Sequence, residues 1–337
     1  MLKGKVTSGD VAKLARVSQS AVSRAFNEGA SVSDVMRARV LKAARKLGYR
    51  PNAIARAMIS GQSRLIAVFV AYLDNQFYPL VLEQLSRTLQ DKGFHVLLFM
   101  TDPGHQDEVV QQMMEYQVEG IVMASATLSS TLARECAQTG IPVVLVNRYV
   151  PSSPASSVTS DNVEGGRLVA KLLTGNGHQR IAFIAGHEDS STNNDREAGF
   201  LSGLQQSGHR LFARAVGNYT FDGAANAARQ LFASVEKPDA IFVANDHMAF
   251  AVMDVIRNEC GLRIPEDVSI VGFDNVPESG WGAYQLTTVE QPSGPMIEAT
   301  AAILMDQIER KTVISRSIVL PAKLIVRRSV RIAGQNG

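Results

Sequence analysis

Three side chains near the N-terminus are of the types that read the edges of DNA bases. Gln19 and Ser20 stand at the leading end of a predicted second helix, and Arg24 follows on a nearby face. Glutamine pairs with adenine through two hydrogen bonds, arginine pairs with guanine or a phosphate, and serine donates or accepts. In a helix-turn-helix unit the second helix enters the major groove, where these side chains would meet bases.

The helix signals around these residues fit such a unit. Thr7 can cap a first helix with Asp10 three residues on, Ser18 can begin the second, and a third starts after Ser33 and stops at Gly48. Two short helices joined by a tight turn and closed by a third form a helix-turn-helix unit. A three-helix bundle that binds no DNA is the alternative on these patterns alone.

The charges are distributed unevenly along the chain. Residues 1–61 hold twelve basic and three acidic residues, whereas the remainder holds 22 basic and 29 acidic residues. The net charge of +2 over 337 residues therefore hides a basic head on a mildly acidic body. Such asymmetry indicates a polyanion-binding module fused to something else, and the alternative is a solvated helical surface.

The body alternates apolar runs with helical stretches, which is typical of parallel βαβ units. The predicted strands are residues 65–71, 95–100, 120–124, 142–146, 180–185, 240–245 and 269–274. The predicted helices are residues 78–91, 107–117, 165–174, 197–207, 222–233 and 248–258. Two successive sets predict two doubly wound α/β halves, which bind ligands in the crevice at the carboxyl ends of their strands.

Polar and aromatic residues cluster just after these predicted strands. They are Asn75, Phe77, Tyr78, Ser125, Thr127, Arg148, Arg196, Tyr219, Asn245 and Asp274. Any one of them can be read as a cap or loop residue; Asn245, for example, could cap a following helix. Several together at strand ends indicate a binding site.

The segments DVAKLARVS (10–18), AVSR (21–24) and LGYRPNA (47–53) resemble the LacI family of bacterial transcriptional regulators. The similarity continues more loosely over nearly the whole chain. It implies a helix-turn-helix DNA-binding domain over residues 1–50 and a hinge helix over 51–61. The DNA contacts that it implies are Thr7, Gln19, Ser20, Ser23, Arg24, Asn27, Asn52, Ala55 and Met58.

The hinge helix is too short to persist alone in water. The resemblance implies that paired hinge helices of a dimer lie in the minor groove at the operator centre. Met58 stands where family members usually insert a leucine between base pairs, and methionine is an acceptable apolar wedge. The alternative is that Met58 belongs to a flexible linker.

For residues 62–337 the resemblance implies a periplasmic-binding-protein-like core that binds an effector and dimerises. Its N-subdomain would cover about residues 62–161 and 292–320, and its C-subdomain about 162–291 and 321–337. Arg196 and Asp274 match the effector-binding arginine and aspartate, and Phe77, Tyr78 and Tyr219 match ligand-stacking positions. The expected effector is a sugar, a sugar acid or a sugar phosphate.

Arg148 departs from the acidic or aromatic residue that several family members carry there. An arginine in the effector crevice would favour a carboxylate or phosphate on the ligand, through charge-assisted hydrogen bonds. The alternative is an internal ion pair with Asp161 or Asp274.

Other functional classes find no support in the sequence. There is no G-x-S-x-G, no P-loop and no G-x-G-x-x-G after a strand, and the six histidines lack ligand spacing. We therefore expect a non-enzymatic, cofactor-free and metal-free homodimer that represses transcription at a pseudo-palindromic operator in double-stranded DNA. Two distant cysteines, the absence of a long apolar run and a start without a secretory pattern favour the cytoplasm over a membrane or export.

Overall fold

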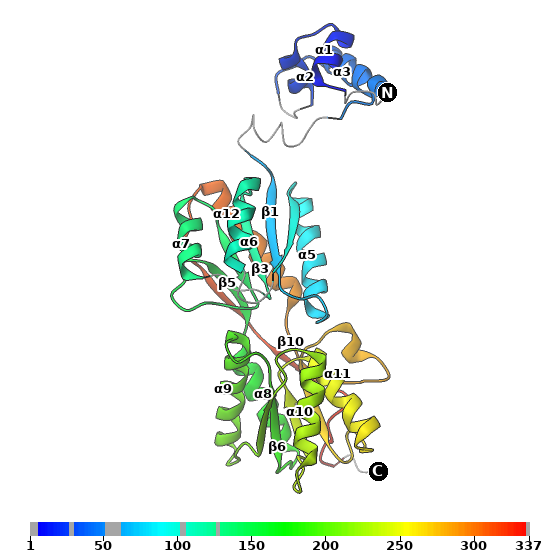
Figure 1. Ribbon diagram of the computed structural model, residues 1–337, viewed down its shortest axis with the longest axis vertical. Coiled ribbons are helices and arrows are strands. Elements are labelled where there is room, and N and C mark those ends of the chain that lie inside the picture. Colours follow the sequence, from blue (N-terminus) through cyan, green and yellow to red (C-terminus); the bar gives the residue numbers. More distant parts are fainter. Residues whose placement is uncertain (1–5, 27–29, 51–61, 102–105, 126–128, 335–337) are drawn as a thin grey trace. The chain divides into compact units, whose positions relative to one another are not determined.

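The computed structural model describes residues 6–26, 30–50, 62–101, 106–125 and 129–334 (Figure 1). The chain divides into two compact units, a head over Met1–Arg64 and a core over Leu65–Gly337. The predicted hinge segment 51–61, with Asn52, Ala55 and Met58, lies outside the described residues, as does Asn27.

The head contains the three predicted helices, α1 (Ser8–Ala15), α2 (Gln19–Ala25) and α3 (Asp34–Leu47). Thr7 and Asp10 form a reciprocal capping box at the start of α1. Gly48 ends α3 with a φ of 69°, a left-handed conformation that glycine adopts without steric cost. The three helices enclose a small core of valines and alanines: Val11, Ala12, Ala15, Val22, Ala25, Val40, Ala43 and Ala44.

In the described part of the chain, the core contains two six-stranded sheets. The first has the order β11-β5-β4-β3-β1-β2, and the second has the order β12-β10-β9-β8-β6-β7. Every pairing is parallel except that of β12 with β10. The strands of the first sheet are β1 (Leu65–Val70), β2 (His95–Met100), β3 (Gly120–Ala124), β4 (Val143–Val146), β5 (Ser156–Ser160) and β11 (Ser317–Leu320). Those of the second are β6 (Ile181–Ala185), β7 (Ala213–Val216), β8 (Ala240–Val243), β9 (Ser269–Asp274), β10 (Thr287–Glu290) and β12 (Lys323–Ile325).

The chain passes between the two sheets three times, after β5, after β10 and after β11. Each half of the core therefore contains segments that are distant in sequence. The first sheet carries α5 (Phe77–Asp91), α6 (Gln106–Met113), α7 (Ser130–Gln138) and α12 (Ser293–Arg310). The second carries α8 (Asn162–Gly175), α9 (Ser191–Gln206), α10 (Phe221–Ala233) and α11 (Asp246–Asp254).

Strand periodicity places helices on both faces of the first sheet. Along β1, Val68 packs into one cluster with side chains of α5 and α12, whereas Phe69 packs into another with side chains of α6 and α7. Successive side chains of a strand point to opposite faces, so an uninterrupted apolar run is the expected sequence of a strand buried on both sides. The carboxyl ends of these strands are left to form a site.

Seven of the twelve strands found among the described residues were expected from the sequence. The structure adds β5, β7, β10, β11 and β12, which are three to five residues long. Within the described residues, no helix is both long and apolar enough to cross a membrane.

Candidate functional site

The head presents the polar face of α2 to solvent. Ala21, Val22 and Ala25 are buried against the other helices, whereas Gln19 and Arg24 are exposed. Gln19 Nε2 donates to Ser8 Oγ over 2.7 Å, and the hydroxyls of the exposed Ser20 and of Ser18 lie 2.9 Å apart. The half-buried Ser23 lies on the same helix, and Thr7 caps α1.

The core brings the polar residues at the strand ends of its two halves together. Asn75 accepts a hydrogen bond from the backbone N–H of Phe77 at the start of α5. The Asn75 side chain also lies close enough to the carboxylate of Asp274, which ends β9 in the second sheet, to lower its pKa. Asn75 therefore lies where the two halves meet.

Arg196 is the largest fully buried side chain among the described residues and is held on four sides. Its Nε donates to Asn162 Oδ1 over 2.9 Å, and its Nη1 donates to the carbonyl of Ala244 over 2.5 Å. Its Nη2 lies 3.5 Å from Asp274 Oδ1, and its guanidinium carbon lies 3.7 Å from the centre of the Phe273 ring. These contacts hold the cation in one orientation beside Asp274.

Asp274 and its neighbour Asp246 form a buried carboxyl pair. Burial raises the pKa of Asp274 to about 6, although Arg196 and Gln291 oppose this shift. Burial raises the pKa of Asp246 well above its ordinary value, and the charge of Asp274 adds to the increase. Because Arg196 stands beside Asp274, we infer that Asp274 ionises first and that Asp246 keeps the proton.

Asp246 has a structural role that does not require its charge. Its two oxygens accept hydrogen bonds from the backbone N–H of Val276 over 3.0 Å and from the hydroxyl of Thr288 over 2.6 Å. An asparagine can retain one acceptor and resembles a protonated acid, whereas an alanine leaves both donors without a partner.

We therefore expect the free energy of unfolding of Asp246→Asn at pH 7 to lie within about 1 kcal/mol of that of the unchanged protein. That of Asp246→Ala should fall by about 2–5 kcal/mol, because two buried donors lose their acceptor.

The raised pKa of Asp274 means that the folded state holds a proton which the unfolded state has already released. The free energy of unfolding should therefore fall as pH rises from about 4 to about 6. Urea unfolding of the three proteins across this range measures both effects, and a larger loss for the asparagine variant than for the alanine variant would contradict the protonated assignment.

Arg148 follows β4 and lies among tyrosines. Its Nη2 donates to the hydroxyl of Tyr72 over 3.1 Å, and Tyr78 also lies close to it. Tyr219, which follows β7 in the other half, is close enough to influence it electrostatically. The hydrogen-bond partner of Arg148 is thus a phenol, and Arg148 forms no internal ion pair with Asp161 or Asp274.

Further contacts join the two halves around the crevice. The hydroxyl of Tyr149 donates to Asp195 Oδ1 over 3.0 Å, and the Tyr149 backbone N–H donates to Ser191 Oγ over 3.2 Å. His247 Nε2 lies 3.7 Å from Asp74 Oδ2. Burial lowers the pKa of His247, so this contact is weak near neutral pH.

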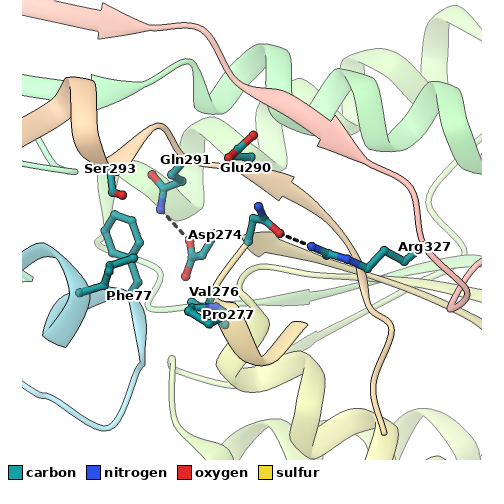
Figure 2. Close-up of a pocket in the computed structure, with 10 residues that line it drawn as sticks. Phe77, Asp274, Val276, Pro277, Glu290, Gln291, Ser293 and Arg327 are labelled. Atoms are coloured by element: carbon teal, nitrogen blue, oxygen red, sulfur yellow. Dashed lines mark hydrogen bonds between the residues drawn. The ribbon is translucent and has the colours of Figure 1, made fainter. Parts of the chain in front are cut away.

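A pocket of roughly 260 Å³ opens beside Asp274. Figure 2 shows Phe77, Gln291 and Ser293 facing Asp274 across it, and Gln291 Nε2 donates to Asp274 Oδ1 over 2.6 Å. Its lining combines both halves of the core: Phe77, Leu80, Asp274, Asn275, Val276, Pro277, Glu290, Gln291, Ser293 and Arg327.

The remaining predicted site residues occupy distinct places. Tyr78 and Tyr219 are buried; the Tyr78 ring meets that of Tyr72, and the Tyr219 hydroxyl lies 3.1 Å from Thr192 Oγ1. Asn245 caps α11, because its Oδ1 accepts a hydrogen bond from the backbone N–H of Met248; the sequence had indicated this cap as the alternative to a ligand contact. Its Nδ2 is buried without a partner. Ser125 Oγ accepts a hydrogen bond from the backbone N–H of Ala71, so it joins the end of β3 to the end of β1.

Sequence reasoning missed several residues that complete the site: Tyr72, Tyr149, Asn162, Gln291 and His247. Asn162 and Gln291 follow β5 and β10, strands whose short polar segments gave no strand signal. Within the described ranges, no group of three His, Cys, Asp or Glu side chains is placed to hold a metal ion.

The head and the core together define a class of protein, a helix-turn-helix unit attached to a two-sheet ligand-binding core. The model of the bacterial regulatory proteins of the lacI family matches residues 7–52, and that of a periplasmic binding protein-like domain matches residues 170–330. Catabolite control protein A of Priestia megaterium is 31% identical, with 97% of this chain and 99% of the relative covered. The chain belongs to the LacI family.

Solved structures support the same conclusion over the whole chain. A lac repressor dimer bound to operator and the anti-inducer ONPF is similar with a TM-score of 0.87 at 28% identity, covering 96% of this chain and 99% of that one. A complex of the transcriptional regulator CelR with cellobiose has a TM-score of 0.72 at 30% identity, covering 96% of this chain and 100% of that one. These relatives are transcriptional regulators and not enzymes.

Proposed function

We propose that the protein is a homodimeric transcriptional repressor that binds a pseudo-palindromic DNA operator through its head and a small polar effector in the crevice of its core. The proposal rests on one observation, that the same chain has both kinds of site. Helix α2 has an exposed polar face, and a buried Arg196–Asp274 pair lies where the strand ends of both sheets meet. The operator-bound and cellobiose-bound relatives support the two halves of the proposal.

The crevice suits a ligand with several hydroxyl groups. Arg196 and Asp274 offer a donor and an acceptor whose positions are fixed by Asn162 and Gln291. Aromatic rings beside them supply the apolar faces on which a sugar ring packs. We assign effector binding to Asn75, Phe77, Tyr78, Arg148, Arg196, Tyr219, Asn245 and Asp274, and a supporting role to Ser125 at the end of β3.

Effector binding would act on the head by changing how the two halves of the core are oriented. The hydrogen bonds of Tyr149 with Asp195 and Ser191 join the two halves, so they form only when the halves approach. A ligand that strengthens or breaks these contacts shifts the equilibrium between two arrangements. Such coupling between sites is typically ~1–3 kcal/mol and is reciprocal.

Removal of the head separates the two proposed activities. A chain of residues 62–337 should keep effector binding and dimerisation but lose operator binding, because residues 1–61 hold twelve basic and three acidic residues, whereas acidic residues outnumber basic ones in the rest of the chain. The full chain should lose operator affinity steeply with salt, by about 0.9 logarithmic units per logarithmic unit of salt for each phosphate contact. Fluorescence anisotropy with labelled operator measures both, and tight operator binding by residues 62–337 would refute the assignment to the head.

Substitutions on α2 should change specificity more than affinity. Gln19→Ala and Arg24→Ala each remove a side chain that is exposed on this helix, and each base contact carries about 1–3 kcal/mol of discrimination. Competition with base-substituted operators should show relaxed preference at one position per half-site. Lys13 is an exposed residue of α1, and Lys13→Ala is the control, which should weaken binding to all operator sequences alike. A uniform loss in the α2 variants would reassign them to the phosphate backbone.

A further inference from the structure

Arg148 is a cation at the crevice, and no carboxylate within the described ranges forms an ion pair with it. The carboxylates that follow the strands of the core have other partners. Asp74 faces His247, Asp195 accepts from Tyr149, and Asp274 pairs with Arg196. Asp161 accepts from the backbone N–H of Glu164 at the start of α8.

The groups that do surround Arg148 are phenols. Burial raises the pKa of Tyr72 well above its ordinary value, so the hydroxyl that accepts from Arg148 carries no negative charge at neutral pH. The Arg148 Nε is buried and has no hydrogen-bond partner. A half-buried guanidinium with an unused donor is costly unless something else neutralises it.

Another unused donor follows β8 in the second half of the core. Asn245 Nδ2 is buried without a hydrogen-bond partner, whereas Arg196 Nη2 forms the ion pair with Asp274 Oδ1. Tyr219 is close enough to Arg148 to influence it electrostatically, and it also contacts Thr192 on α9, the helix that carries Arg196. Asn147, which precedes Arg148 in the chain, has a buried Oδ1 acceptor without a partner.

The unpaired positive charge of Arg148, with its unused Nε donor, indicates which kind of ligand would bind there. A carboxylate or a phosphate offers several acceptor oxygens and a negative charge, and arginine binds both through paired hydrogen bonds. A neutral sugar would satisfy the hydroxyl-binding pair of Arg196 and Asp274 but would leave the charge of Arg148 unpaired.

We propose that the effector is an anionic carbohydrate derivative, a sugar acid or a sugar phosphate, whose anionic group binds the Arg148 guanidinium while its hydroxyls contact Arg196 and Asp274. This inference rests on the proposed function of the crevice as an effector site. It makes Arg148 the residue that selects charged over neutral ligands.

Matched ligands test the inference on the full chain. The neutral ligands are glucose, galactose, ribose and fructose. Each is compared, by thermal shift and calorimetry, with its terminal phosphate and, where one exists, with its aldonic acid. Inorganic phosphate alone is a further probe. At least one acid or phosphate should bind, and its neutral parent should bind at least about 10-fold more weakly. The two anionic series distinguish a carboxylate site from a phosphate site.

Variants of Arg148 assign the preference to that side chain. Arg148→Gln should weaken binding of the anionic ligand about 10- to 100-fold and leave the affinity for the neutral parent unchanged, as expected for loss of a charge-assisted contact. Arg148→Lys should restore part of the loss. Arg87→Gln, an exposed arginine of α5, is the matched control and should have no effect. Urea unfolding of Arg148→Gln verifies that the variant is folded.

Three outcomes would overturn the inference. The first is that a neutral sugar is the ligand and binds the unchanged protein and Arg148→Gln with equal affinity. The second is that an anionic ligand binds both proteins with equal affinity, and the third is that no anionic ligand of the series binds. Operator binding is measured in parallel and separates this failure from that of the proposed function. If a neutral sugar alters operator affinity, the repressor function stands and the anionic specificity falls. If the full chain binds no operator, the repressor function fails whatever the crevice binds.

Discussion

Replacing Arg196 with alanine is expected to destabilise the core by about 3–5 kcal/mol and to abolish the effector response. The substitution removes hydrogen bonds to Asn162 and Ala244, the ion pair with Asp274 and the contact with the Phe273 ring. Asp274 is then left as a buried acid without its cation, and breaking a buried pair in this way is more costly than replacing both partners. Urea unfolding measures the loss of stability, and calorimetry measures the loss of effector binding.

A second substitution identifies the source of this cost. Asp274→Asn removes the buried negative charge, so the double variant should lose less stability than the sum of the two single changes. Operator binding should persist in both single variants under conditions in which they are folded, because the head is a separate compact unit. Additive losses would show that Arg196 stabilises the core mainly through Asn162 and Ala244.

The head was the part most open to sequence reasoning. Its helix boundaries depend on local chemistry, since Thr7, Ser18 and Ser33 each accept a backbone N–H at the start of the helix that they cap. Such caps involve residues two or three positions apart and can be read from a single sequence. The structure confirms all three helices.

The core was predictable only where strands are apolar. β1 and β9 are continuous runs buried on both faces, which is why they were recognised. β5 is equally buried but consists mostly of serine, and its hydroxyls bond to distant partners such as Ser317 and Gln291. These partners lie more than 130 residues away, so no local pattern could have revealed that the strand is buried.

The site was predicted as a set of residues and not as a set of contacts. Strand ends indicated Arg196, Asp274 and Arg148, but the sequence left open which of them pair. The structure pairs the first two and gives Arg148 a tyrosine partner. Pairing is a property of the three-dimensional arrangement, because each contact joins segments that only the two-sheet topology brings together.

Gly199 is expected to be as important for effector binding as residues that touch the ligand. A Cβ at this position would lie 1.9 Å from the carbonyl oxygen of Val163 on α8, far inside van der Waals contact. The obstacle is backbone and cannot rotate away, so Gly199→Ala must push α8 and α9 apart. We expect a loss of about 3 kcal/mol, at the upper end of the usual cost of overpacking.

The same displacement should weaken the crevice. Arg196 precedes Gly199 by less than one helical turn, and its partner Asn162 begins α8 next to Val163, so separating the helices lengthens the Arg196–Asn162 hydrogen bond. Gly175→Ala provides the control, because it lies on α8 with open space around its Cβ and exchanges glycine for a better helix former. Urea unfolding and calorimetry on both variants decide the matter. Equal stability and equal effector affinity in the two would show that α8 and α9 can separate without disturbing the buried arginine.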